Sequence, residues 1–417
     1  MKLLKYALAW KENPVITENP MTPLERRTVS SLALLYSFRM LGLFMVLPLL
    51  ALYAADLPGA TPAMLGLALG IYGLSQAALQ IPLGWLSDRI GRKPVIVSGL
   101  LVFALGSVVA AQADTATGII VGRFLQGAGA IASTVMALVA DLTSEEQRTK
   151  AMAIVGASIG ASFAVALVLG PLVAASGGLQ AVFYLTAVLA LVGIVVVLLR
   201  VPTPERLLAH DEVGARGVHL AQALADRHLL RLNFGVFTLH FILMACFLLL
   251  PTLLEESMGV GRDDHWQVYL PALLLSLLGM LPLMRLAEKG GRLREVFPAA
   301  IALLLLALPG LVFVASGPMF YLSLWLFFVG FNYLEATLPS LVSKAVFAGG
   351  RGTAMGIYSS CQFLGAFAGG AVGGYVLQQW GSQGLLAACL LPGIIWLALF
   401  IPGALFAADS ASDLPGA

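Results

Sequence analysis

Twelve long apolar segments, separated by shorter polar stretches, dominate this chain of 417 residues. They lie at about 30–54, 62–86, 94–112, 116–140, 149–175 and 178–201, and again at about 231–255, 265–287, 295–316, 318–344, 353–378 and 381–406. Most are long enough to cross the roughly 30 Å hydrocarbon core of a bilayer as a tilted helix. None alternates strictly between apolar and polar residues, as a barrel strand does. The pattern predicts an all-α membrane protein with twelve transmembrane helices.

The composition excludes several classes of protein. Charged residues make up 11% of the chain, whereas a soluble domain carries about 25%. The three cysteines, Cys246, Cys361 and Cys389, all lie in apolar segments, so no disulfide framework or metal site is expected. No phosphate-binding loop of the Gly-x-x-x-x-Gly-Lys type occurs, so direct coupling to ATP is not expected. We therefore expect no cofactor, no metal and no nucleic-acid partner.

Lysine and arginine are unevenly distributed among the polar stretches. All but three of the 24 fall in the N-terminal tail or in every second interval between spans. The exceptions are Arg39 and Arg123, which lie inside spans, and Arg262, which lies in an interval of the opposite set. Basic loops stay on the cytoplasmic side of a membrane. We therefore predict that both termini are cytoplasmic.

The longest polar stretch divides the chain into two similar halves. The predicted parts are a cytoplasmic tail at 1–28, a six-helix bundle at 29–201, a cytoplasmic linker at 202–229, a second six-helix bundle at 230–407 and a short cytoplasmic tail at 408–417. The halves resemble each other at an offset near 200 residues, and Ala151-Met152 and Ala354-Met355 open corresponding spans. Two pseudo-symmetric bundles of this kind are a transporter architecture, with the binding site between them near the middle of the membrane.

Two motifs connect the chain with a known family. The interval after the second span reads Gly84-Trp85-Leu86-Ser87-Asp88-Arg89-Ile90-Gly91-Arg92-Lys93, and the fourth span contains Arg123-Phe124-Leu125-Gln126-Gly127-Ala128-Gly129-Ala130. Both match signatures of the major facilitator superfamily, and the chain resembles that family over nearly its whole length. Within the family it is most similar to the YajR-type efflux transporters of bacterial inner membranes. Gly170-Pro171 resembles the antiporter motif of drug–proton exchangers, although Ala174-Ala175 stand where that motif has glycines.

The first motif suggests a conformational latch. Gly84 and Gly91 permit close helix contact and a tight turn. Asp88 would be attracted by the positive N-terminal end of a helix, which the resemblance identifies as the eleventh, starting near Gly352-Thr353. Arg92 would pair with Asp141 at the end of the fourth span. These contacts would hold the halves together on the cytoplasmic side, whereas Arg89 is interpreted mainly as a topology anchor.

Ionisable residues inside the spans need a reason, because each costs at least roughly 2.5–3.5 kcal/mol at a helix centre. Glu335 is the only acid deep in a span, and Asn332 shares its helix face. Arg39, His240 and Glu335 lie at similar depth on three spans that the resemblance places around the cavity, so they could meet there. Glu335 would then bind and release the coupled proton, and the nearby charge of Arg39 would favour the release. Alternatively, Glu335 and Arg39 would form a structural ion pair between the halves.

Further polar residues are candidate contacts for the substrate or for protons. They are Arg123, Gln126, Tyr36, Gln76 and Gln362. For each glutamine, a hydrogen bond between helices is an equally ordinary role. Arg123 could stabilise a change of protonation or bond to carbonyl groups of a neighbouring helix.

The sequence favours one function over three others. The leading reading is a monomeric secondary transporter in a bacterial inner membrane, which exports a small hydrophobic or drug-like solute by alternating access in exchange for protons. A proton-coupled uptake symporter or facilitator on the same fold is the alternative, because fold does not set direction. A receptor or scaffold without transport activity has no need of charges inside the membrane. An enzyme is not expected, because no catalytic cluster is present.

Overall fold

The computed structural model describes residues 20–203, 222–313, 317–345 and 351–401. Most of the two predicted tails and most of the predicted linker, namely residues 1–19, 204–221 and 402–417, lie outside this part of the chain. All regular elements within it are helices.

The first half of the chain forms four long helices and two short ones. They are α2 (Pro23–Tyr53), α3 (Pro62–Ile90), α4 (Arg92–Ala111), α5 (Ala116–Ala128), α6 (Ala132–Asp141) and α7 (Glu145–Arg200). Helix α2 starts six residues before the predicted bundle boundary, because Thr22 and Glu25 cap each other's backbone N–H groups. The other oxygen of Glu25 accepts a hydrogen bond from the N–H of Ser144 at 2.8 Å, which ties the start of α2 to that of α7.

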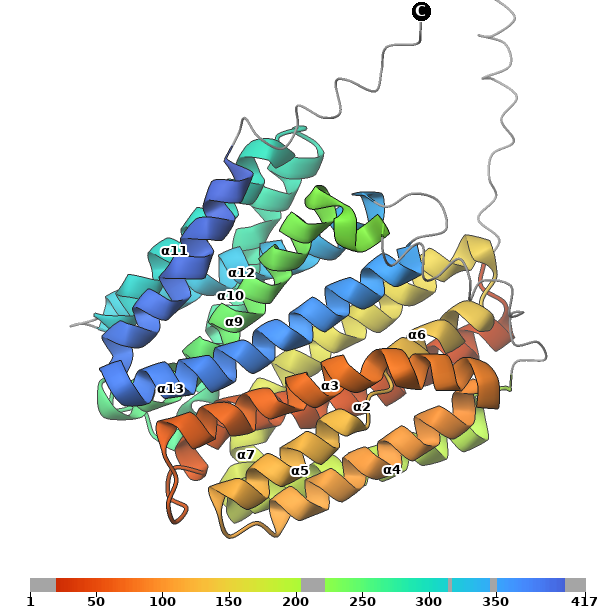
Figure 1. The fold of residues 1–417 in the computed structure, drawn as a ribbon, viewed down its shortest axis with the longest axis horizontal. Coiled ribbons are helices and arrows are strands. Elements are labelled where there is room, and N and C mark those ends of the chain that lie inside the picture. Colours follow the sequence, from red (N-terminus) through yellow and green to blue (C-terminus); the bar gives the residue numbers. More distant parts are fainter. Residues whose placement is uncertain (1–19, 204–221, 314–316, 346–350, 402–417) are drawn as a thin grey trace, which may run out of the picture.

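The second half repeats this arrangement. Its helices are α9 (Arg227–Glu256), the 3-10 turn η2 (Arg262–Asp264), α10 (Trp266–Glu288), α11 (Leu293–Val312), α12 (Gly317–Ala345) and α13 (Arg351–Phe400). Figure 1 shows the two halves as separate groups of helices, with α3 and α13 running alongside each other between them. We call the two ends of the molecule the Arg92 end and the Arg262 end, after one residue at each.

Two of the helices contain two spans each. Helix α7 has 56 residues, which at about 1.5 Å per residue is far longer than a bilayer is thick. Its path breaks at Gly178, and that of α13 breaks at Gly381. The described residues contain ten helical segments long and apolar enough to cross a membrane, and counting α7 and α13 as two spans each gives twelve. The prediction of twelve helices in two bundles is confirmed.

The backbone also records the internal repeat. Six described glycines have positive φ angles, and they form three pairs: Gly59 with Gly259, Gly91 with Gly291, and Gly178 with Gly381. The members of the last pair are nearly identical, with φ and ψ of 63° and −161° at Gly178 and 66° and −163° at Gly381. Each pair is separated by 200 to 203 residues, in agreement with the offset seen in the sequence.

The bundles pack tightly against each other at the Arg262 end. A Cβ atom placed on Gly66 of α3 would lie 2.2 Å from the carbonyl oxygen of Gly370 on α13, and one on Gly70 would lie 2.5 Å from that of Phe367. One turn further, a Cβ on Gly73 would lie 2.5 Å from the carbonyl oxygen of Phe363. Only glycine permits so close an approach of two backbones.

The same two helix faces are uncovered toward the Arg92 end. Ile81 and Trp85 continue the glycine face of α3, and they are 57% and 44% exposed. On α13, a Cβ placed on Gly352 or Gly356 would meet no atom within 4 Å. The bundles are therefore closed at the Arg262 end and apart at the Arg92 end.

Candidate functional site in the two bundles

The second bundle brings together three polar side chains from three helices. His240 of α9 lies 3.7 Å from Glu335 of α12, measured from Nε2 to Oε2. Gln362 of α13 lies between them, with its Nε2 atom 2.8 Å from His240 Nε2 and 3.3 Å from Glu335 Oε1. We call these three residues the Glu335 cluster.

The hydrogen bonds of the cluster define the form of the histidine. His240 Nδ1 lies 3.1 Å from the carbonyl oxygen of Val236, which only accepts, so Nδ1 carries the proton. Nε2 faces the amide nitrogen of Gln362, which only donates. The arrangement therefore corresponds to a neutral imidazole that accepts at Nε2, beside a carboxylate that also accepts from Gln362.

Exposure differs sharply among these groups. The side chain of Glu335 is 37% exposed and that of His240 is 10% exposed. Asn332, one turn before Glu335, donates from Nδ2 to Ser276 Oγ of α10 at 2.8 Å, and so fixes α12 against α10. Asn332 is thus a neighbour of the cluster on the same helix as Glu335, and its hydrogen bond to Ser276 serves packing between helices.

A second polar cluster lies inside the first bundle. Arg39 of α2 donates to Gln76 Oε1 of α3 at 2.7 Å and to the carbonyl oxygen of Gly129 at 3.2 Å, and Gln76 donates to Gln80. Arg39 is 1% exposed, and its guanidinium lies 5.6 Å from the centre of the Phe103 ring. Its charge is held by hydrogen bonds and aromatic faces within its own bundle.

Arg123 occupies a similar environment next to this cluster. It donates to Gln126 Oε1 at 2.8 Å and to the carbonyl oxygen of Ala68 at 3.3 Å, and Gln126 donates in turn to Ser107 at 2.8 Å. Its guanidinium lies 5.0 Å from the ring centre of Tyr72, and that of Arg39 lies 6.0 Å from the same ring. The bond between Arg123 and Gln126 lies within α5, whereas those to Ala68 and Ser107 run between helices, which is the packing alternative considered for the glutamines.

One predicted meeting is wrong. Arg39 does not reach Glu335, because its side chain turns into the first bundle toward Gln76 and Phe103. The structure does bring His240 and Glu335 together, and it adds Gln362 between them. Tyr36, one of the predicted contacts for the substrate or for protons, is a buried side chain that is only 6% exposed.

The loop motif forms a compact charged network at the Arg92 end. Arg92 Nε donates to Asp141 Oδ2 at 2.9 Å, as predicted, and Nη1 donates to Asp88 and to Ser87 Oγ at 2.7 Å. Gly91 has a φ of 100°, which accounts for the glycine between α3 and α4. Ser87 also belongs to this network, a role that the sequence did not predict although Ser87 lies inside the motif. The contact of Asp88 with the start of α13 stays a prediction.

Two other motif residues have different surroundings. The Arg89 guanidinium stacks 3.6 Å from the ring centre of Trp85 on the surface of α3. Gly84 faces α6, where an added Cβ would lie 3.1 Å from Ser133 Oγ. Arg89 therefore contacts its own helix, as a surface anchor does.

An ion pair that the sequence did not predict joins the bundles at the Arg262 end. Arg262 Nη1 lies 2.9 Å from Asp56 Oδ2 of the first bundle, and its Nε lies 2.9 Å from Glu255 Oε1 of the second. The guanidinium also lies 5.6 Å from the centre of the Tyr53 ring. At the same end, Ala63 N–H donates to Gln378 Oε1 of α13 at 3.2 Å.

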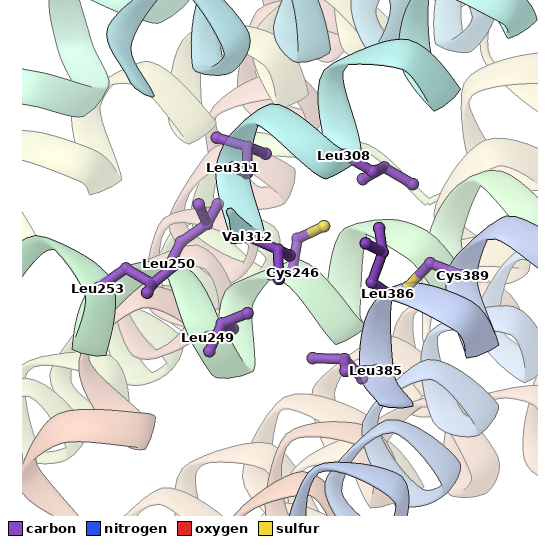
Figure 2. Close-up of a pocket in the computed structure, with 10 residues that line it drawn as sticks. All are labelled: Cys246, Leu249, Leu250, Leu253, Leu308, Leu311, Val312, Leu385, Leu386 and Cys389. Atoms are coloured by element: carbon purple, nitrogen blue, oxygen red, sulfur yellow. The ribbon is translucent and has the colours of Figure 1, made fainter. Parts of the chain in front are cut away.

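A small apolar pocket lies elsewhere in the second bundle, between α9, α11 and α13 (Figure 2). Its volume of about 20 Å³ is room for about one water molecule. Leucines, one valine and the thiols of Cys246 and Cys389 line it. The lining contains none of the charged or amide groups of the Glu335 cluster, so this pocket is not the candidate site.

Two helical bundles that share a repeat, close at one end and contain ionisable groups within the membrane define a transport protein. The family model described as Major Facilitator Superfamily matches residues 32–346. The chain belongs to the major facilitator superfamily, and it is a multi-pass membrane transporter rather than an enzyme.

Curated relatives agree with this assignment. The chain is 46% identical to the inner membrane transport protein YajR of Escherichia coli (strain K12), over 90% of this chain and 83% of the relative. It is 28% identical to the multidrug resistance protein MdtH of Aeromonas salmonicida (strain A449), over 86% and 88%. The predicted resemblance to YajR-type transporters is confirmed.

Solved structures share the fold. A bacterial homolog of the human lysosomal transporter Spinster, in an inward-facing and unoccupied conformation, superposes with a TM-score of 0.74 at 14% identity, covering 93% of this chain and 98% of that one. The human organic anion transporter MFSD10 superposes with a TM-score of 0.63 at 22% identity, covering 91% and 100%. At these identities the likeness concerns the fold alone.

Proposed function

We propose that this protein is a proton-coupled exporter of a small hydrophobic or drug-like solute. The observation that carries the proposal is the Glu335 cluster, in which a 37% exposed carboxylate lies 3.7 Å from an imidazole within the membrane. The YajR relative is named as an inner membrane transport protein and the MdtH relative as a multidrug resistance protein, which supports export.

Glu335 is the proton-binding group in this proposal. Coupled exchange needs a group that is protonated in one state of the transporter and gives up its proton to the solute or to a nearby cation in the other. Because Arg39 is bonded within the first bundle, the cation that displaces the proton is the imidazolium of His240 or the solute itself. Exchange occurs when the cavity opens to one side after the other, so that proton and solute move in opposite directions.

The latch is the second part of the proposal. The structure is open at the Arg92 end, and there Asp88, Arg92 and Asp141 are joined within the first bundle. In the opposite state, closure at this end brings Asp88 against the N-terminal end of α13, whose partial positive charge stabilises the carboxylate. The motif thereby stabilises the state that is open at the Arg262 end.

Orientation, domain limits and assembly belong to the proposal as well. The basic residues at the Arg92 end support a cytoplasmic location for that end, for both termini and for the 202–229 linker. Bundles at 29–201 and 230–407 in one chain make the monomer a complete transport unit. Uptake by symport on the same fold remains the alternative, because the Glu335 cluster binds protons equally well for either direction.

Proton movement in reconstituted vesicles tests the proposal. Glu335→Gln keeps the size and hydrogen bonding of the side chain but removes titration. We expect solute counterflow to persist and solute-induced proton movement to fall at least about tenfold, the effect of losing one essential proton carrier. Glu288→Gln, at an exposed position that ends α10, is the matched control. Equal proton movement by the Glu335→Gln variant would refute the assignment.

A further inference from the structure

We infer that Gln362 is a positioning residue that responds to the proton occupancy of His240 and Glu335 and transmits it to the contact between the two bundles. The inference rests on the proposed proton coupling and adds the element that connects it to movement. Gln362 is the one side chain whose hydrogen bonds reach both ionisable groups of the cluster in the described structure.

The donors and acceptors make this arrangement specific for one protonation state. The amide nitrogen of Gln362 has two hydrogens, and it donates one to His240 Nε2 and one to Glu335 Oε1. A proton on His240 Nε2 would turn that acceptor into a donor, so that two donors would face each other. The amide must then rotate to present its oxygen, or move away.

Rotation links the two ionisable groups. The amide oxygen would then face Glu335 Oε1, which repels it unless Glu335 is protonated and donates. The amide nitrogen therefore fits the pair without added protons, and the amide oxygen fits the fully protonated pair. A proton on His240 alone leaves the Gln362 amide with an unfavourable contact to one of its two neighbours, which favours its displacement and a direct contact between His240 and Glu335.

The position of Gln362 in the chain connects it to closure. The next residue, Phe363, is the one whose carbonyl oxygen lies 2.5 Å from a Cβ placed on Gly73 of α3. The Phe363 ring also contacts that of Tyr72, with 6.4 Å between ring centres. A displacement of the Gln362 side chain therefore acts on α13 next to Phe363, where the tight contact with α3 ends and the open face of α13 begins.

Other titratable groups around the cluster do not compete for this role. Tyr358, one turn before Gln362 on α13, is a buried phenol, and phenols ordinarily titrate near pH 10, far from neutrality. The neighbour of His240 from α12 is the ring of Phe331, which does not titrate and whose centre lies 6.1 Å from that of the imidazole. Arg39 on α2, although charged, is bonded to Gln76 on α3.

The first test observes His240 directly. The full chain, labelled with ¹⁵N-histidine in detergent, is titrated by NMR, and the His240 signals are assigned by their absence in His240→Asn. We expect the Nδ1–H tautomer at alkaline pH in the parent. In Gln362→Met, which keeps side-chain length, we expect the tautomer preference to fall on the order of tenfold, as for the loss of one hydrogen bond to Nε2. An unchanged tautomer ratio would overturn the inference.

The second test observes closure. A cysteine replaces Gly356, on the open face of α13, in a background where Cys246, Cys361 and Cys389 are replaced by alanine. Because thiol ionisation alone makes any labelling rate depend on pH, each rate is divided by that of the same cysteine in the denatured protein at the same pH. We expect this normalised rate to depend on pH in the parent, and to lose that dependence in Gln362→Met. The control is Gln379→Met, at an exposed position on the same helix.

The two tests separate this inference from the proposed function. Retained pH dependence in Gln362→Met, together with its loss in Glu335→Gln, would overturn the role of Gln362 and leave proton coupling at Glu335 intact. Retained pH dependence in Glu335→Gln would instead refute coupling at Glu335, and with it the transmission through Gln362. The NMR titration decides the positioning role independently of transport.

Discussion

Arg262 lies 2.9 Å from Asp56, a residue 206 positions earlier in the chain, and this ion pair joins the two bundles at the end where they are closed. Glu255 binds the same guanidinium from the side of the second bundle. The pair therefore adds an electrostatic contribution to a closure whose main component is the glycine contact between α3 and α13. In the proposed alternating-access cycle, the ion pair between Arg262 and Asp56 must break each time this end opens. Both side chains are partly exposed to solvent, which makes such a break less costly.

Replacement of Arg262 by glutamine should weaken closure at this end. Exposed ion pairs contribute about 0.2–1 kcal/mol each, so the open population should rise by up to several-fold. Spin labels at Ala55 and Ser257, which are both exposed near this end, would report the change as a longer distance between the bundles. Arg292→Gln is the control, because Arg292 pairs with Glu295 inside its own bundle. Identical distance distributions in parent and variant would contradict a role in closure.

Asp88→Asn should have the opposite effect. It removes the carboxylate that the N-terminal end of α13 stabilises in the proposed latch, at a cost of about 0.3–2 kcal/mol to the state closed at the Arg92 end. Labelling of a cysteine at Gly356 should therefore become faster. Asp141→Asn provides the comparison, because it disturbs the same Arg92 network from α6. Equal acceleration by both variants would assign the effect to Arg92 rather than to the contact between the bundles.

Gly66→Ala tests the contact between α3 and α13. The added methyl group would lie 2.2 Å from the carbonyl oxygen of Gly370, so one backbone must move. The spin-label distance should increase, and transport should fall as the closed state is lost. Gly156→Ala, where an added Cβ meets no atom within 4 Å, should leave both unchanged. A normal distance in Gly66→Ala would show that the helices can adjust without separating.

Sidedness is accessible to an impermeant thiol reagent on intact cells. We expect a cysteine at Asp114, near the Arg262 end, to be labelled from outside. A cysteine at Gln222, in the 202–229 linker, should react only after the membrane is permeabilised, because basic segments are retained in the cytoplasm. Labelling of the Gln222→Cys variant in intact cells would reverse the proposed topology.

Much of the fold was predictable from the sequence, because a membrane leaves few options to a backbone. Hydrogen bonds must be satisfied within each span, so the length and apolarity of the segments indicated twelve helices. The pairing of Arg92 with Asp141 followed from the family motif. The approach of His240 to Glu335 followed from their similar depth on neighbouring spans.

Side-chain direction was not predictable in the same way. Depth along a helix says how far a residue lies from the membrane surface, but the packing of three or four helices decides where its side chain turns. Arg39 shared the depth of Glu335, yet the acceptors on Gln76 and Gly129 and the face of Phe103 lay closer. Arg262 looked like an isolated charge because its partner Asp56 is brought near only by the way the two bundles meet, although Glu255 lies in its own bundle.

The glycine contact between α3 and α13 has an electrical consequence. The backbones touch at Gly66 and Gly70, so this end is closed, whereas the facing surfaces of α3 and α13 are uncovered toward the Arg92 end. The membrane voltage then falls mainly across the short insulating layer formed by the glycines, at about 2.3 kcal/mol per unit charge for each 100 mV. In the proposed mechanism, a proton bound by Glu335 is already on one side of that layer. The voltage therefore drives the reorientation of the loaded protein more than the arrival of the proton.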